Sequence, residues 1–216
     1  MTQKAKILEK LEENYLFAVI RGKSAQDAYE ISKAAYKGGI KNIEVTFTTP
    51  NANKAIEKLV EEFKDTDMVI GAGTVMDDVT ARIAIMSGAR FIVSPNFVPE
   101  ISTICNRYAI PYLPGCGSVT EISNAMATGV EVVKVFPGGV LGPSFVKDIH
   151  GPIPQVALMP SGGVSLENME TWMKNGAWAV GIGSALTKDV AVNGYESVTE
   201  QAKKFIKKYK KNLNIK

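Results

Sequence analysis

The sequence predicts a fold of the α/β class. Short apolar segments with the length of strands alternate with longer segments whose apolar residues have helical spacing, along almost all of the 216 residues. Glycine, proline and small polar residues separate the segments, as expected where regular elements begin and end. Strands that alternate with helices in this way pair in parallel, because each helix returns the chain to the same end of the sheet.

Eight apolar runs are the strand candidates, and each is bounded by turn residues. They cover residues 15–21, 40–47, 68–73, 91–95, 111–113, 132–136, 156–159 and 179–183. Residues 1–14 alternate charged and apolar positions, which predicts an amphipathic helix and not a signal peptide. Signals for the start of later helices are Ser24, Pro50-Asn51, Asp77-Asp78 and Ser165, and signals for their ends are Gly38-Gly39, Gly88, Gly129 and Gly176.

Eight strand–helix units predict a single-domain (β/α)8 barrel, the TIM barrel, with an N-terminal helix, over residues 1–216. An open, doubly wound sheet could also be built from eight units. The regular repeat favours closure, and no low-complexity linker or second domain interrupts it.

The composition indicates a globular protein, with 45% hydrophobic and 22% charged residues. No stretch approaches the roughly 18 apolar residues that a membrane span needs. Two cysteines and one histidine cannot form a structural zinc site by themselves. We therefore expect a cytoplasmic protein with no membrane partner.

The net charge of +3 comes from the end of the chain, where residues 203–216 contain lysines and no acidic residue. Such a tail could bind nucleic acid or lipid headgroups. We favour a terminal helix that packs Phe205, Ile206 and Tyr209 inward and keeps its lysines in water, because no aromatic platform or arginine cluster accompanies the charge. No nucleic-acid partner is expected.

Polar and small residues gather at the carboxyl ends of the expected strands, and the amino ends contribute almost none. They include Arg21, Glu44, Thr74, Lys134 and the glycine-rich segments near residues 162 and 183. In a barrel these ends open onto one mouth, which is where the active sites of barrel enzymes lie. This asymmetry favours an enzyme.

Lys134 stands alone in the apolar run Val132-Val133-Lys134-Val135-Phe136. Burial of an isolated charge is costly, so such a lysine tends to pair with a carboxylate or to lose its proton. A neutral amine at the end of a buried strand can attack a ketone to form a Schiff base. A lysine that only points outward from a strand edge is the alternative.

Glu44 is the corresponding acid in the apolar run Ile43-Glu44-Val45-Thr46. It falls on the second expected strand and Lys134 on the sixth, and inward side chains of alternate strands share a layer of a barrel. The two could therefore face one cavity, either as a structural ion pair or with Glu44 moving the protons of a lysine-based reaction. Burial would raise the pKa of Glu44 toward a useful value.

Anion-binding groups are expected around this pair. Ser161-Gly162-Gly163 and Gly183-Ser184 follow the last two strands, where many barrels bind phosphate through backbone N–H groups. Arg21 and Thr74, at the ends of the first and third strands, could hold a carboxylate. Tight turns and a solvated surface arginine are the alternatives.

Several of these segments together resemble one family. The segments are Ile43-Glu44-Val45-Thr46, Gly71-Ala72-Gly73-Thr74, Ile92-Val93-Ser94-Pro95, Lys134-Val135-Phe136-Pro137, Pro160-Ser161-Gly162-Gly163-Val164 and Gly181-Ile182-Gly183-Ser184-Ala185-Leu186. In this order they resemble the bacterial 2-keto-3-deoxy-6-phosphogluconate aldolases, also called 4-hydroxy-2-oxoglutarate aldolases, from about Phe17 to Leu186.

The resemblance implies a lyase of carbohydrate metabolism, in the Entner–Doudoroff pathway. It would be a class I aldolase without metal or other cofactor, usually a homotrimer, acting on a small keto acid to release pyruvate. Lys134 resembles the Schiff-base lysine, Glu44 the general acid and base, and Thr74 the residue that holds the pyruvyl carboxylate. Pro95 and Phe136 resemble pocket walls, and Gly162, Gly163, Gly183 and Ser184 the phosphate cradle.

Two positions depart from the family pattern. Some relatives carry an arginine four residues after the glutamate, where this chain has Thr48, and others end the first strand with an arginine, as Arg21 does here. Ser161 stands where threonine is frequent. Two other functions stay open: a phosphate-binding barrel isomerase, epimerase or synthase, and a catalytically silent sensor of sugar phosphates.

Overall fold

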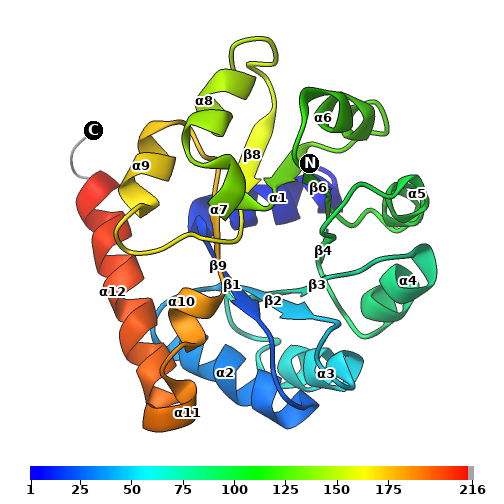
Figure 1. Ribbon diagram of the computed structural model, residues 1–216. Helices are drawn as coiled ribbons and strands as arrows, with labels where there is room; N and C mark the ends of the chain where they lie inside the picture. Colours follow the sequence, from blue (N-terminus) through cyan, green and yellow to red (C-terminus); the bar gives the residue numbers. More distant parts are fainter. Residues whose placement is uncertain (214–216) are drawn as a thin grey trace.

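A computed structural model describes residues 1–213, which form nine strands at the centre and twelve helices, most of them around the strands (Figure 1). The strands are β1 (Leu16–Ile20), β2 (Asn42–Thr46), β3 (Val69–Gly73), β4 (Ile92–Val93), β5 (Tyr112–Leu113), β6 (Gly115–Cys116), β7 (Val132–Val135), β8 (Ala157–Pro160) and β9 (Val180–Ile182). The helices are α1 (Gln3–Asn14), α2 (Ala25–Lys37), α3 (Ala52–Glu62), α4 (Asp78–Met86), α5 (Pro99–Arg107), α6 (Val119–Met126), α7 (Gly138–Leu141), α8 (Ser144–Ile149), α9 (Met169–Lys174), α10 (Ser184–Thr187), α11 (Val190–Asn193) and α12 (Glu196–Leu213).

The strands form two parallel sheets, with the orders β5-β4-β3-β2-β1-β9 and β6-β7-β8. Only Pro114 separates β5 from β6, and proline cannot donate the backbone hydrogen bond that would continue a strand. An isolated parallel bridge joins Ser161, just beyond β8, to Gly181 in β9. The α/β class and the parallel pairing expected from the sequence are confirmed, in two sheets and not in one continuous sheet.

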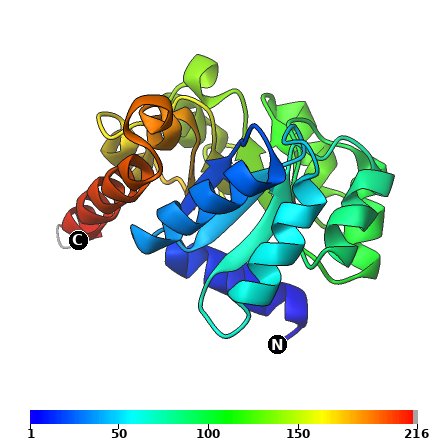
Figure 2. The same cartoon turned by 90° about the horizontal axis from the view of Figure 1, so that it is seen from below.

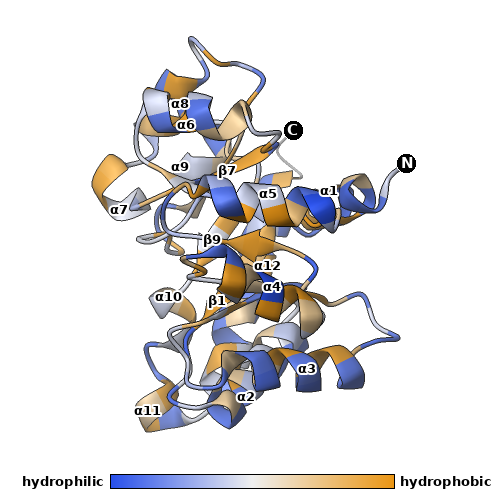
Figure 3. Cartoon of the chain, turned by 90° about the vertical axis from the view of Figure 1, so that its right-hand side faces the viewer, coloured by the Kyte–Doolittle hydropathy of each residue, from blue (hydrophilic) through white to orange (hydrophobic). Residues whose placement is uncertain are grey.

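Each of the eight expected strands overlaps a strand of the structure, because apolar runs between turn residues form strands that are buried on both faces. Figure 3 shows the hydrophobic colour concentrated on strands such as β7 and β9, whereas the helices alternate both colours. The expected strand at residues 111–113 continues after Pro114 as β6, which the sequence reasoning missed.

Most helix ends follow the sequence signals. Ser24 and Asp77 cap α2 and α4 by accepting hydrogen bonds from the backbone of Asp27 and Thr80. Gly39, Gly88, Gly129 and Gly176 adopt positive φ where helices end. Ser165 was the wrong start for α9. Its N–H donates to Asn168 Oδ1 at 2.9 Å, and the helix begins only at Met169.

Helix α1 closes the amino ends of the strands, seen at one side of the molecule in Figure 2. Asn42, the buried first residue of β2, donates from Nδ2 to the Leu11 carbonyl at 2.9 Å and accepts from Asn14 Nδ2 at 2.8 Å. Near the start of α1, Lys4 Nζ donates at 3.0 Å to the carbonyl of Gly129, which precedes β7 in the sequence. The carboxyl ends of the strands are left uncovered by α1.

Helix α12 holds most of the basic tail. Phe205 is buried and Ile206 and Tyr209 pack against the core, so the expected inward face is confirmed. Tyr209 stacks on Tyr15 with ring centroids 4.6 Å apart. Lys216, the last lysine of the tail, lies outside the described residues. Within residues 1–213, no helix combines the length and the apolar character needed to cross a membrane.

Candidate active site

A cavity of about 500 Å³ opens at the carboxyl ends of the strands and brings all the expected site residues together. Strand ends converge here because the strands are parallel. The eleven expected residues among its lining are Arg21, Glu44, Thr74, Pro95, Lys134, Phe136, Ser161, Gly162, Gly163, Gly183 and Ser184, and the other three are Val19, Val164 and Thr187.

Lys134 lies in the buried part of this cavity. It is the third residue of β7, it pairs with Gly115 of β6 and Met159 of β8, and it is only 5% exposed. Its Nζ lies 5.0 Å from the centre of the Phe136 ring, which covers it with an apolar face. The amine is therefore buried among strands, as expected from the apolar run in the sequence.

Glu44 is fully buried on the same cavity, and neither of its carboxyl oxygens has a hydrogen-bond partner. Burial raises the pKa of Glu44, and the positive charges of Lys134 and Arg21 oppose that rise. The sequence expectation of a raised pKa is thus confirmed. Glu44 and Lys134 interact through space but are not joined by a hydrogen bond, so the carboxyl oxygens are free to meet another group.

The Glu44 carboxyl fits into the structure because the neighbouring strand β3 carries glycine where a side chain would collide with it. Glu44 lies in register with Gly71 of β3, and a Cβ at Gly73 would stand 1.8 Å from Glu44 Oε1. No side chain larger than hydrogen fits there. Thr74 follows immediately with φ of 53°, an uncommon backbone conformation for a residue other than glycine, and its side chain lines the cavity.

Arg21 extends from the end of β1 to the rim. Its Nε donates to Thr48 Oγ1 at 2.9 Å, and Thr48 Oγ1 is 2.9 Å from Thr46 Oγ1. Arg21 is exposed, whereas Thr46 is buried. The Thr48 hydroxyl therefore contacts the arginine that follows β1.

The glycine segments form the exposed side of the cavity. Gly162 and Gly163 have φ of 80° and 79°, which only glycine adopts easily. A Cβ at Gly163 would lie 2.7 Å from the Cα of Gly139, and Gly138 N donates to the Ser161 carbonyl at 2.9 Å. The loops after β7 and β8 thus pack backbone against backbone and leave N–H groups near the mouth, an arrangement suited to anions.

Three lining residues were missed. Val19 lies two residues before Arg21 and so on the same side of β1, and Thr187 lies three residues after Ser184 in α10, so strand and helix periodicity could have found both. Val164 directly follows the glycine pair. Among residues 1–213, no three side chains of histidine, cysteine, aspartate or glutamate gather as metal ligands.

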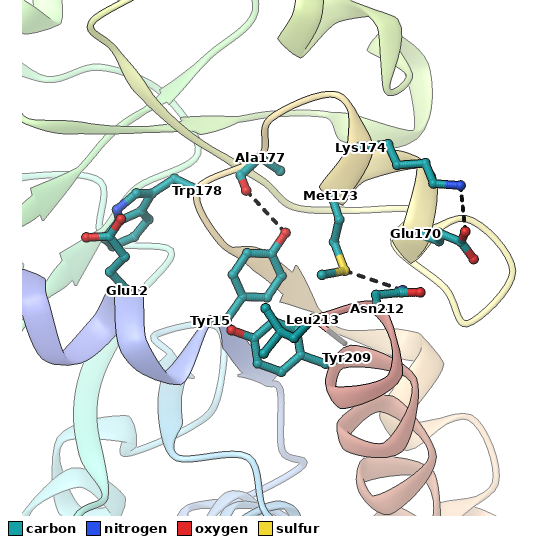
Figure 4. A pocket seen from close by; sticks show the side chains of 10 residues that line it. All are labelled: Glu12, Tyr15, Glu170, Met173, Lys174, Ala177, Trp178, Tyr209, Asn212 and Leu213. Carbon is teal, nitrogen blue, oxygen red and sulfur yellow. Dashed lines mark hydrogen bonds and ion pairs between the residues drawn. The ribbon is translucent and has the colours of Figure 1, made fainter. Parts of the chain in front are cut away.

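A second cavity, of about 430 Å³, lies against the opposite ends of the strands (Figure 4). Tyr15 donates from its hydroxyl to the Ala177 carbonyl at 3.2 Å there. Among the residues that line this cavity, Lys174 is the one amine, and it is exposed and paired with Glu170 at 2.7 Å. The residues that line this second cavity include no buried amine or carboxyl group, in contrast to the cavity around Lys134.

Several proteins with similar sequences are aldolases. The family model "KDPG and KHG aldolase" matches residues 7–200. The 2-dehydro-3-deoxy-phosphogluconate aldolase of Treponema pallidum is 35% identical over 81% of this chain and 86% of its own. The 2-dehydro-3-deoxy-6-phosphogalactonate aldolase of Escherichia coli is 30% identical over 90% of this chain and 94% of its own.

A solved structure agrees in fold and in sequence. The KDPG aldolase of Legionella pneumophila, crystallised with pyruvate captured as a covalent carbinolamine, has a TM-score of 0.83 and 31% identity over 94% of this chain and 97% of its own. The resemblance carried by the Glu44, Lys134 and glycine segments is therefore confirmed over nearly the whole chain. The protein belongs to the KDPG and KHG aldolase family.

Proposed function

We propose that this aldolase cleaves 2-keto-3-deoxy-6-phosphogluconate to pyruvate and glyceraldehyde 3-phosphate through a Schiff base on Lys134. One observation carries the proposal: a single cavity holds a buried amine, a buried carboxyl under the influence of that amine, and an exposed rim of glycine and hydroxyl groups. The same machinery would cleave 4-hydroxy-2-oxoglutarate to pyruvate and glyoxylate, without using the phosphate end.

Lys134 performs the covalent steps. After it has given up its proton, the amine attacks the C2 ketone of the substrate, and loss of water from the carbinolamine leaves a protonated imine. The imine draws the electron pair of the C3–C4 bond as the C4 hydroxyl loses its proton, so glyceraldehyde 3-phosphate leaves and an enamine remains. Protonation of the enamine at C3 and attack of water at C2 then release pyruvate and restore the amine.

Glu44 moves the protons, directly or through a water molecule. It gives a proton to the departing hydroxyl of the carbinolamine, accepts the C4 hydroxyl proton during cleavage, and supports the final hydrolysis. A carboxyl with a raised pKa holds and releases protons closer to neutral pH than an exposed one. Its two oxygens, unpartnered in the protein, are available for these transfers.

The substrate extends from the buried part of the cavity to its exposed side. Arg21 and Thr74 bind its carboxylate, with charge from the guanidinium and a hydroxyl from Thr74. Pro95 and Phe136 wall the reacting carbons. The phosphate lies at the open side, held by Ser161, Gly162, Gly163, Gly183 and Ser184, where the glycines with positive φ leave backbone N–H groups accessible.

We also infer the wider setting of the site. The short break at Pro114 and the bridge between Ser161 and Gly181 support one closed (β/α)8 barrel in a single domain. The two buried free thiols, Cys105 and Cys116, fit the reducing environment of the cytoplasm. The partner of the protein is a small keto acid, and we expect it to act without a cofactor.

Lys134→Ala is expected to lower kcat by about three orders of magnitude or more, because no other group supplies the imine. Treatment of the wild-type protein with pyruvate and borohydride should add one reduced three-carbon unit at Lys134, detected by mass spectrometry. Lys147→Ala, a change of an exposed lysine on α8, is the control and should keep both activity and adduct. Full activity of Lys134→Ala, or a wild-type protein without the adduct, would refute the proposal.

Glu44→Gln is expected to lower kcat by about 10²- to 10⁴-fold while pyruvate still binds, because the amide cannot transfer protons. The wild-type pH profile should show an acidic limb above 4.5, the ordinary pKa of glutamate, since burial raises the pKa of Glu44. Steady-state rates across pH test both points. Unchanged turnover in the variant would remove Glu44 from the mechanism.

The same variant also has a stability signature. A raised native pKa means that the folded state binds the Glu44 proton more tightly than the unfolded chain, so stability falls as pH rises from 4.5 through that native pKa. Glu44→Gln removes this loss. In urea titrations it should be more stable than the wild type at neutral pH, and the difference should vanish below pH 4.5.

Substrate preference tests the phosphate site. We expect kcat/KM for the phosphorylated six-carbon acid to exceed that for 4-hydroxy-2-oxoglutarate by about tenfold or more, since one well-held anion contributes at least that factor. The C4 epimer of the six-carbon acid, measured in parallel, reports the preference at that carbon. Inorganic phosphate should compete only with the phosphorylated substrates. Equal kcat/KM values with and without the phosphate would exclude the cradle.

Self-association as a homotrimer is the last part of the proposal, and an exposed apolar stripe on α4 supports it. Val79, Ile83 and Met86, on one face of the helix, are 65%, 43% and 72% exposed. Ile83→Glu is expected to dissociate the assembly in sedimentation experiments, whereas Val192→Glu, on exposed α11, should not. A wild-type protein that sediments as a single chain of 23.3 kDa would contradict the trimer.

A further inference from the structure

Thr48 takes no part in the proposed reaction steps, and its loop is held in place by another residue. It is exposed, it lies two residues beyond β2, and it does not line the cavity. Yet its Oγ1 accepts the Nε–H of Arg21 at 2.9 Å and lies 2.9 Å from the buried Oγ1 of Thr46. The Arg21 side chain is thereby connected through two hydroxyls to the buried end of β2.

The atom that is bound determines what the guanidinium can still do. Arginine has five N–H donors in one plane, and Nε carries one of them. With Nε held by Thr48, the edge formed by the two terminal nitrogens stays available for a bidentate contact with a carboxylate. Arg21 lines the cavity, and its guanidinium is close enough for its charge to act on Glu44.

The loop itself is held by a different threonine. Thr49 is buried, and its Oγ1 accepts the backbone N–H of Gly22 at 2.9 Å, which ties the end of β1 to the end of β2. Gly22 is packed so closely that a Cβ there would lie 2.5 Å from the backbone nitrogen of Ala28. The backbone is therefore fixed without Thr48, whose hydroxyl is left to act on the side chain of Arg21.

We propose that Thr48 is a positioning residue for substrate binding, which holds the Arg21 guanidinium so that its terminal edge receives the carboxylate of the keto acid. Without this hydroxyl an exposed arginine loses its fixed orientation, because a long side chain in water samples many rotamers. Thr46 supports Thr48 from the buried side. The inference rests on the proposed function, in which Arg21 binds the carboxylate.

The test removes the hydroxyl and leaves the shape. In Thr48→Val the KM for the phosphorylated six-carbon acid should rise about fivefold, the effect of one hydrogen bond, while kcat stays within about twofold. Thr48→Ser keeps the hydroxyl and should restore the wild-type KM. Thr103→Val makes the same change on α5, where Oγ1 bonds only to its own helix at Pro99, and should change nothing.

A second measurement reports the carboxylate site without turnover. The pyruvate concentration that gives half-maximal borohydride trapping on Lys134 should rise by a similar factor in Thr48→Val. In an Arg21→Gln background, addition of Thr48→Val should have no further effect, because the group that it positions is gone.

The outcomes separate this inference from the proposed function. If the wild-type protein forms no adduct, the proposed function fails. If the adduct forms but Thr48→Val keeps the wild-type KM and trapping curve, the positioning role is wrong. It is equally wrong if Thr48→Ser is as impaired as Thr48→Val, or if the loss persists in full when Arg21 is absent.

Discussion

The site depends on the carboxyl group of Glu44, which is buried away from water near the amine of Lys134. Glu44 has no solvent contact and no hydrogen-bond partner, and the nearby charges of Lys134 and Arg21 only partly offset the cost of burial. A protein that maximised stability would replace such a group with an apolar residue. Its presence at the centre of the cavity fits the proposed role of an acid whose raised pKa lets it exchange protons at a higher pH than an exposed glutamate.

Parallel strands make this arrangement possible. Their carboxyl ends meet on one side, so Arg21, Glu44, Thr74 and Lys134 reach one cavity although more than a hundred residues separate the first from the last. Helix α1 covers the opposite side through Asn42. Because one end of the strands is closed and the other is open, the cavity has a buried inner part and an exposed rim. This arrangement suits a ketone in the buried part and a phosphate at the rim.

Glycine has a second role in this site besides its use in turns. At Gly73 it leaves the space that the Glu44 carboxyl fills, and at Gly163 it permits contact with the backbone at Gly139. Both contacts are between segments far apart in sequence or on different strands. Gly162 and Gly163 were interpreted from the sequence as anion-binding, with a tight turn as the alternative. The packing roles of Gly73 and Gly163 emerged only from the positions of neighbouring strands and loops.

The sequence by itself determined the order of the strands and helices and indicated a buried Lys134, because apolar periodicity and helix caps are local signals. Together with the family resemblance, it named eleven of the fourteen residues around the cavity. Tertiary structure decided the division into two sheets at Pro114, the delayed start of α9, the inclusion of Val19 and Thr187 in the cavity, and the contact between Thr48 and Arg21. These depend on which strand ends meet and how closely, and no local pattern in the chain encodes a distance between residues on different strands.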